Sequence, residues 1–117
     1  MKTILIVEDT EFNIDLLVQL LEEDYNLLIA KDGVQGVAMT EKHHPDLVLM
    51  DIAMPLMDGY DATRKIREKF KKLPVIGLSS HAMTGDKEKA IAAGCTDYIT
   101  KPIDEDELIR VLQRHLG

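Results

Sequence analysis

Residues 3–9 read TILIVED, an aliphatic run that leads directly into two acids, Glu8 and Asp9. A strand that is covered on both faces carries a near-continuous aliphatic run, so this stretch predicts a buried parallel strand. Four further apolar runs follow at fairly even spacing. The five predicted strands are Thr3–Val7, Tyr25–Ala30, Asp46–Met50, Pro74–Leu78 and Asp97–Thr100.

Amphipathic segments with helical spacing separate these runs. The first predicted helix carries an apolar stripe formed by Phe12, Leu16, Leu17, Leu20 and Leu21. The last carries a similar stripe formed by Leu108, Val111, Leu112 and Leu116. Alternating strands and helices predict an α/β fold, with a five-stranded parallel sheet covered by helices on both faces. No linker interrupts the pattern, which predicts one domain over residues 1–117.

Helix boundary signals agree with this pattern. Asp104 precedes Glu107 by three residues, as an N-cap precedes its reciprocal acid, and Asp58 with Asp61 is a weaker version. Gly94 suits the end of a helix. These signals place helices before the fourth and fifth strands and after the fifth.

Composition excludes several classes of function. The 117 residues include 21 acids and 14 bases, a net charge of −7, which argues against direct binding to nucleic acid or to an anionic membrane. No apolar run approaches the ~20 residues of a membrane helix, so no membrane insertion is expected. The single cysteine, Cys95, cannot form an internal disulfide, which predicts a cytoplasmic protein. Its place beside the fifth strand predicts a small buried residue rather than a redox sensor.

Functional side chains follow the predicted strands. Glu8 and Asp9 end the first strand, Asp51 follows the third, Ser79 the fourth and Lys101 the fifth. Ligands of parallel α/β sheets bind beyond the carboxyl ends of the strands. If the first and third strands are neighbours, three carboxylates converge, and two charges about 4 Å apart repel by about 4 kcal/mol at an effective dielectric constant near 20.

A hard divalent cation would relieve this repulsion, and Mg²⁺ is usually held by one or two carboxylates plus a phosphate. Lys101 adds an ammonium group and Ser79 a hydroxyl group. Carboxylate, cation, ammonium and hydroxyl together suit a phosphoryl group that is attached to an aspartate. The predicted chemistry is therefore reversible phosphorylation of a carboxylate.

Several ordered motifs carry a resemblance to a known family. They are Ile6-Val7-Glu8-Asp9, Leu49-Met50-Asp51, Met54-Pro55, Asp58-Gly59, Pro74-Val75-Ile76 running to Ser79, Tyr98, and Lys101-Pro102. Together they resemble the response-regulator receiver domain of two-component signalling, of the chemotaxis-regulator type. The resemblance implies a flavodoxin-like (βα)5 three-layer sandwich with strand order 2-1-3-4-5.

The resemblance also implies roles for residues around the phosphoryl group. Asp51 matches the phosphoacceptor and Lys101 the lysine that binds the phosphoryl group. Asp9 matches the direct Mg²⁺ ligand, Glu8 a neighbour that acts mainly through metal-bound water, and Ala53 a backbone carbonyl ligand. Mn²⁺ is expected to substitute for Mg²⁺.

A second group of matches concerns the response to phosphorylation. Ser79 matches the switch hydroxyl. Tyr98 matches the aromatic residue whose side chain turns inward or outward with the state of that switch. The Lys101-Pro102 bond matches one that is commonly cis. The implied function is a switch that accepts phosphate from a histidine kinase or histidine phosphotransfer protein. It then changes the face of the fourth helix, fifth strand and fifth helix for an unidentified downstream protein.

Alternatives stay open at this point. The chain could be a docking module that takes no phosphate, or an aspartyl-phosphate phosphatase. The phosphatase needs a second aspartate two residues after its nucleophile, where this chain has Ala53. A flavin or nucleotide carrier is disfavoured because no glycine-rich phosphate loop is present. Ala53 and His81 occupy positions that influence the lifetime of the acyl phosphate in the family.

Two adjacent histidines, His43 and His44, invite a metal-site interpretation. Adjacent residues point to different sides of a helix, so a shared ion is awkward. A solvated helix end is therefore the prediction for this pair.

Overall fold

A computed structural model describes residues 1–54, 57–79 and 85–117 of the chain. Strands and helices alternate throughout, as the sequence predicts. The strands are β1 (Thr3–Val7), β2 (Asn26–Ala30), β3 (Leu47–Asp51), β4 (Val75–Ser79) and β5 (Asp97–Thr100). The helices are α1 (Glu11–Leu21), α2 (Gly33–His43), α3 (Gly59–Lys69), α4 (Asp86–Ala93) and α5 (Glu105–Leu116).

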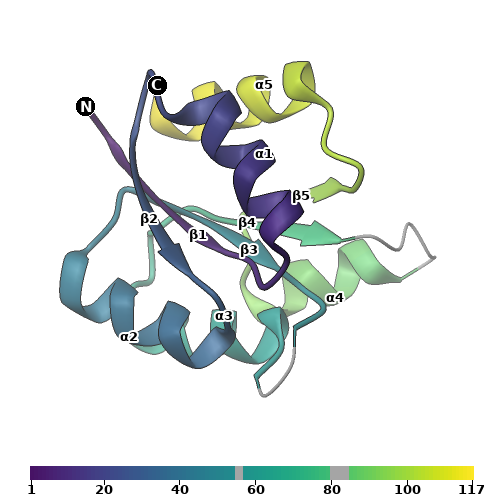
Figure 1. Cartoon of the computed structure of the whole chain (residues 1–117). Helices are drawn as coiled ribbons and strands as arrows, with labels where there is room; N and C mark the ends of the chain where they lie inside the picture. Colours follow the sequence, from purple (N-terminus) through teal and green to yellow (C-terminus); the bar gives the residue numbers. More distant parts are fainter. Residues whose placement is uncertain (55–56, 80–84) are drawn as a thin grey trace.

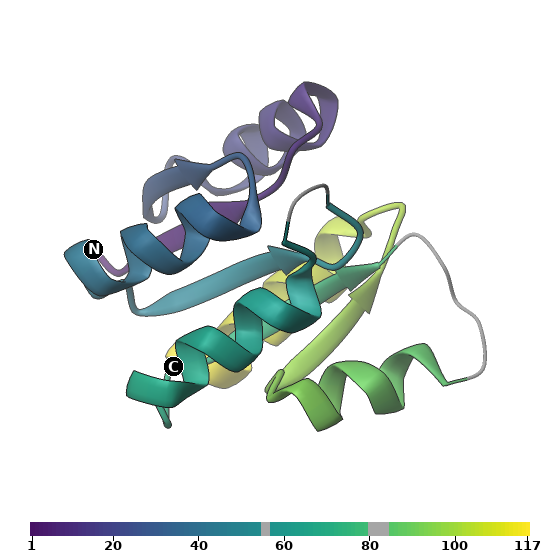
Figure 2. The same cartoon turned by 90° about the horizontal axis from the view of Figure 1, so that it is seen from below.

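The five strands form one parallel sheet in the order β2-β1-β3-β4-β5, which confirms the predicted fold. Helices α1 and α5 cover one face of the sheet, and α2, α3 and α4 cover the other (Figure 1). The view from below places α2, α3 and α4 in front of the sheet, with α1 and α5 behind it (Figure 2). The molecule is therefore a three-layer sandwich whose central strands are covered on both sides.

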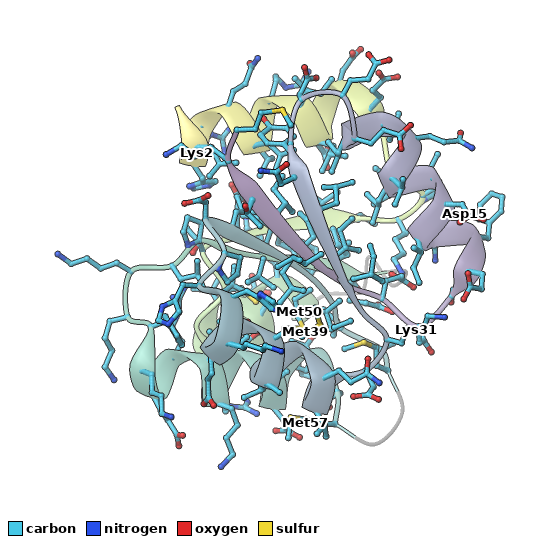
Figure 3. The ribbon with its side chains drawn as sticks, turned by 60° about the vertical axis from the view of Figure 1, so that its left-hand side comes forward. Lys2, Asp15, Lys31, Met39, Met50 and Met57 are labelled. Carbon is cyan, nitrogen blue, oxygen red and sulfur yellow. The ribbon has the colours of Figure 1, made fainter. Side chains whose placement is uncertain are left out.

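Each face of the sheet has its own apolar core. Ile4, Ile6 and Leu49 point toward α1 and α5, whereas Leu5 and Met50 point the other way. This alternation follows from the two-residue period of a strand, and burial on both faces explains why the runs are continuously apolar. Met39 of α2 and Met50 of β3 both belong to the core between the sheet and helices α2, α3 and α4 (Figure 3).

The predicted stripe of α1 is wrong at its first residue. Phe12 is 75% exposed, and the buried face is formed by Ile14, Leu17 and Leu21. At 3.6 residues per turn, Phe12 lies about 200° around the helix from Ile14, on the opposite side. The four-residue spacing grouped Phe12 with Leu16 and Leu20. Packing against the sheet, which the spacing does not encode, decides which side of the apolar stripe is buried. The α5 stripe is confirmed, with Leu108, Val111 and Leu112 buried.

The predicted boundaries and caps agree closely with the structure. Strands β2, β3 and β4 each begin one residue later than predicted, and β3 and β4 also end one residue later, on Asp51 and Ser79. Asp58 accepts a hydrogen bond from the N–H of Asp61, and Asp104 accepts from those of Asp106 and Glu107. Gly94 ends α4 at a positive φ of 111°. Helix α2 has a further cap that the sequence analysis missed, Asp32, which accepts from the N–H of Gln35.

Two smaller predictions, for the histidine pair and for Cys95, are also answered by the fold. His43 and His44 are exposed at the end of α2, and the ring of His44 packs edge-on against Phe70 with centroids 5.2 Å apart. Cys95 is buried just before β5, and this burial raises the pKa of its thiol. Among the described residues, no helix is long and apolar enough to cross a membrane.

Candidate functional site

The central strands bring the predicted acids together. Val7 pairs with Met50 across β1 and β3, so the residues that follow this pair leave the sheet side by side. Glu8, Asp9 and Asp51 each place a carboxylate oxygen within 4.8 Å of the others. The predicted convergence of three carboxylates is confirmed. Glu8 and Asp51 are buried, whereas Asp9 is exposed.

Lys101 reaches the same point from the end of β5. Its Nζ lies 2.9 Å from Glu8 Oε2 and 3.3 Å from Asp51 Oδ1. The backbone fixes this approach, because the Lys101 N–H donates to the Ser79 carbonyl oxygen. The Lys101-Pro102 bond is cis, as expected. One ammonium group is thus shared between two buried carboxylates, which lowers the cost of burying them.

The environment of Asp51 raises the pKa of its carboxyl group into the neutral range. Burial and the negative charge of Glu8 raise the pKa of Asp51 to about 7, although Lys101 acts in the opposite direction. The N–H of Ala53 also donates to Asp51 Oδ1 over 3.3 Å and favours the charged form. A carboxylate in this setting gains from an added cation, because its own charge is incompletely compensated.

Asn13 and Gly59 contribute to the site, but the sequence assigned neither of them a role. Asn13 does so through Glu8. Glu8 is completely buried, and its Oε1 accepts hydrogen bonds of 3.3 Å from the Thr10 N–H and from Asn13 Nδ2. Nothing about an asparagine in the first turn of a helix marks it as a partner of a buried acid. The only available signal was that a buried carboxylate must find hydrogen-bond donors nearby.

Gly59, which the sequence showed only as part of the Asp58-Gly59 motif, is the second such residue, and its identity has a steric reason. A Cβ atom at this position would lie 2.3 Å from the carbonyl oxygen of Asp51. The Gly59 N–H also donates to the Ile52 carbonyl oxygen over 2.9 Å. Helix α3 therefore begins directly against the backbone that carries Asp51, and only glycine permits this approach.

The remaining predicted residues lie around this cluster. Ser79 is the last residue of β4, 3% exposed, and pairs with Thr100 of β5, while Leu78 before it pairs with Asp51. Tyr98 in β5 is half-buried and packs against the core on the α2–α4 side of the sheet. Ala53 is exposed beside Asp51. His81 lies outside the described residues.

The donor set suits a hard cation. Carboxylate oxygens from Glu8, Asp9 and Asp51 are the ligand type that Mg²⁺ prefers, and Mg²⁺ needs few protein ligands because it keeps several waters. The exposure of Asp9 leaves the cluster open to solvent on one side. The residues present therefore fit a divalent cation that shares its coordination with water or phosphate.

Comparisons with known proteins agree with this geometry. Residues 4–113 match the response regulator receiver domain family. The sequence is 36% identical over 119 residues to the polar-differentiation response regulator DivK of Brucella ovis, covering 99% of this chain and 97% of DivK.

Two solved structures are informative. One is the receiver domain of the sensor histidine kinase PA1611 from Pseudomonas aeruginosa PAO1, with a magnesium ion coordinated in its active site cleft. It has a TM-score of 0.92 and 39% identity, and the match covers 99% of this chain and 98% of that one. The other is the receiver domain of Ssk1 in complex with the histidine phosphotransfer protein Ypd1 from Saccharomyces cerevisiae. The TM-score is 0.91 at 27% identity, with 97% and 88% of the two chains covered. This chain therefore belongs to the response regulator receiver domain family, whose members are switches of two-component signalling rather than classical enzymes.

Proposed function

We propose that the chain, over residues 1–117, is a phosphoacceptor switch in which Asp51 carries the phosphoryl group. The observation that carries the proposal is the shared cluster of Glu8, Asp9, Asp51 and Lys101 at the carboxyl edge of the sheet. A buried aspartate beside one ammonium group and two further carboxylates is poorly explained by stability alone. It is well suited to a group whose charge changes during a reaction.

In the forward step a carboxylate oxygen of Asp51 attacks the phosphorus of a phosphohistidine. The new P–O bond forms while the P–N bond breaks, and the imidazole nitrogen keeps the electron pair of that bond. The Lys101 ammonium, already 3.3 Å from Asp51 Oδ1, is placed to bind an oxygen of the transferred group. In a separate second step water hydrolyses the acyl phosphate, which releases inorganic phosphate and restores the carboxylate.

Magnesium is the proposed cofactor, and Mn²⁺ is expected to substitute for it. Asp9, Asp51 and the Ala53 carbonyl would hold the ion, with Glu8 acting through its waters. When bound, the ion supplies positive charge that offsets the negative charge of the phosphoryl oxygens. The chain's own residues position the nucleophile, and the protein catalyses its own phosphorylation and hydrolysis without acting on an external substrate.

Ser79 and Tyr98 are proposed to relay the change to the α4–β5–α5 face. Ser79 ends the strand next to β3, so a phosphoryl group on Asp51 can draw its hydroxyl group inward. Tyr98 lies on the neighbouring strand and lines a cavity of about 360 Å³ together with Lys87, Arg110 and Val111. A changed position of Tyr98 would reshape this cavity, which a downstream protein would then recognise.

The proposed phosphodonor is a histidine kinase or a histidine phosphotransfer protein, as the Ypd1–Ssk1 complex suggests. Such a donor must approach the edge of the sheet where Asp51 lies. Phe12 is 75% exposed in the first turn of α1, three residues after Asp9, and offers an apolar contact for that approach. The cytoplasmic location stays a prediction that follows from the lone cysteine and from this partner class.

A phosphatase activity is less well supported. The position two residues after Asp51 holds Ala53, which has no acid–base group. Two residues after Asp9 stands Glu11, whose carboxylate lies 2.7 Å from Lys31 Nζ. Figure 3 shows Lys31 at the surface. Neither position holds the second aspartate that such a phosphatase needs.

Labelling with acetyl phosphate and Mg²⁺ tests the proposal. Mass spectrometry should show one added phosphoryl group, stable in acid and labile in base, on the wild-type protein. Asp51→Asn should carry none, whereas Asp61→Asn, which changes an exposed acid of α3, should label normally. Unlabelled wild-type protein would support the docking-module alternative, and full labelling of Asp51→Asn would refute the assignment of the phosphoacceptor.

A further inference from the structure

Glu8 is the most deeply buried charge at the site, and within the described residues three donors of different kinds bind its carboxylate. Lys101 Nζ contacts Oε2 at 2.9 Å, while the Thr10 N–H and Asn13 Nδ2 contact Oε1, each at 3.3 Å. The Thr10 contact comes from the backbone and would persist with almost any side chain at that position. Asn13, in contrast, donates through its side chain, so a substitution at this residue removes a neutral hydrogen-bond donor from Glu8 Oε1.

Lys101 has three N–H donors, and the position of its ammonium group depends on all the oxygens that share them. Its ammonium lies nearer to Glu8 than to Asp51, at 2.9 Å against 3.3 Å. A phosphoryl group on Asp51 adds oxygens that compete for the same ammonium group. If Lys101 turns toward them, Glu8 loses its charged partner while its side chain stays buried, and a buried charge without compensation is costly.

We propose that Asn13 is a positioning residue that releases Lys101 for phosphoryl binding. This inference rests on the proposed function of Asp51. The Asn13 amide holds Oε1 of Glu8 on the α1 side, so Glu8 keeps two neutral donors when the ammonium turns away. Without Asn13, Glu8 depends more strongly on Lys101 and holds it away from the phosphoryl group.

The chemistry of the amide fits this role. A neutral donor stabilises the carboxylate without adding positive charge, which would weaken the attraction of the cluster for a cation. An acid at position 13 would repel Glu8 instead. The residue is only half-buried and belongs to the first turn of α1, so the position can be changed without emptying the core.

Four proteins form a double-mutant cycle that tests the inference: wild type, Asn13→Ala, Glu8→Gln and the double variant. With acetyl phosphate and Mg²⁺, Asn13→Ala should label about three- to tenfold more slowly than wild type, the scale of one lost hydrogen bond. In the Glu8→Gln background the same substitution should cause little further loss, because no buried charge remains to be held. Equal losses in both backgrounds would overturn the inference.

Asn13→Asp separates positioning from folding. Aspartate has the same shape, and its preference for the first turn of a helix offsets part of its repulsion of Glu8, so urea unfolding should still show a cooperatively folded protein. Its labelling should nevertheless fall at least as far as that of Asn13→Ala. Wild-type labelling rates in both Asn13 variants would contradict the proposal.

A direct readout is the ¹⁵N signal of the Lys101 ammonium group in lysine-labelled protein. On phosphorylation this signal should shift in wild type, and the shift should be smaller in Asn13→Ala. An identical shift in the two proteins would show that Asn13 does not control Lys101. If wild type itself is not phosphorylated, the proposed function fails rather than this inference.

Discussion

Opposing effects meet at Asp51. Burial and the charge of Glu8 favour its neutral form, whereas Lys101 and the Ala53 N–H favour the carboxylate. The balance leaves the group near the midpoint of titration at neutral pH, so the addition of a cation or the loss of a charge has a large effect. A nucleophile held in this way responds strongly to metal binding.

The pH dependence of stability follows from this shift. An unfolded aspartate loses its proton near pH 4, but Asp51 in the folded protein does so at about pH 7. Between these values Asp51 binds more protons in the folded state than in the unfolded state, so its contribution to the free energy of unfolding falls as the pH rises from about 4 to about 7. Without Mg²⁺, Asp51→Asn should therefore be more stable than wild type at pH 8, and its advantage should shrink toward pH 4.

Urea unfolding at a series of pH values measures this difference. Asp61→Asn serves as the control, because it removes a surface carboxylate that is 2.8 Å from Arg64. An advantage of Asp51→Asn that stays constant from pH 4 to pH 8 would contradict the assigned cause.

Ser79 should separate chemistry from response. Ser79→Ala keeps the acids and Lys101, so acetyl phosphate should still label Asp51, within about a factor of ten of the wild-type rate. The variant lacks the hydroxyl group that a phosphoryl group would draw inward. Hydrogen exchange over β5 and α5 should change on phosphorylation of wild type and change much less in Ser79→Ala. A wild-type exchange response in the variant would disprove the switch role.

At the scale of the elements, polar contacts fix α3 and α5 to β5 or to the loop that precedes it. Arg67 of α3 donates to the Gly94 carbonyl oxygen at 2.7 Å and to Thr96 Oγ1 at 3.0 Å. Asp97 of β5 accepts from Arg114 at 3.0 Å and lies 3.1 Å from His115 Nε2, both in the last turn of α5. These contacts tie α3 to the loop before β5 and α5 to β5 itself, the strand that carries Tyr98.

The cap of α5 gives a prediction for element stability. The Asp104 side chain accepts from the N–H groups of Asp106 at 2.9 Å and Glu107 at 3.2 Å. Asp104→Ala leaves both donors to water and should lower the free energy of unfolding by about 1 kcal/mol, measured with urea. Asp104→Asn keeps an oxygen at this position and should lose much less. Equal losses in the two variants would show that charge, not capping, is responsible.

At the scale of the whole molecule, the parallel topology gathers all functional strand ends at one edge. Any protein that delivers a phosphoryl group to Asp51 must cover that edge, whereas a small donor such as acetyl phosphate need not. Surface side chains around the edge should therefore matter for one donor and not for the other.

Phe12→Ala should reveal this distinction. Phosphotransfer from a phosphorylated histidine phosphotransfer protein should slow by about tenfold, the scale of 1.4 kcal/mol for a buried aromatic contact. Labelling by acetyl phosphate should stay unchanged. Ile91→Ala on α4, which also removes an exposed apolar side chain, is the matched control. Equal slowing with both donors would place the defect in the site itself rather than in docking.

Much of this protein was determined by the sequence alone. Strands β1 and β3 were predictable because a strand buried on both faces must be apolar throughout, and that pattern is local. The caps Asp58 and Asp104 were predictable for the same reason, since each satisfies N–H groups two or three residues away. The roles assigned to Asp51 and Lys101 came from ordered motifs, and their placement followed from where the strands end.

Only the tertiary structure decided which side of α1 faces the core, and hence that Phe12 is exposed. It alone showed that Glu8 shares Lys101 with Asp51 over 2.9 and 3.3 Å and draws Asn13 into the site. It also gave the steric reason for Gly59. Local patterns fix periodicity and hydrogen-bond needs along one segment. Contacts between side chains 93 residues apart, such as Glu8 and Lys101, depend on how all five strands are arranged, and no single segment encodes that arrangement.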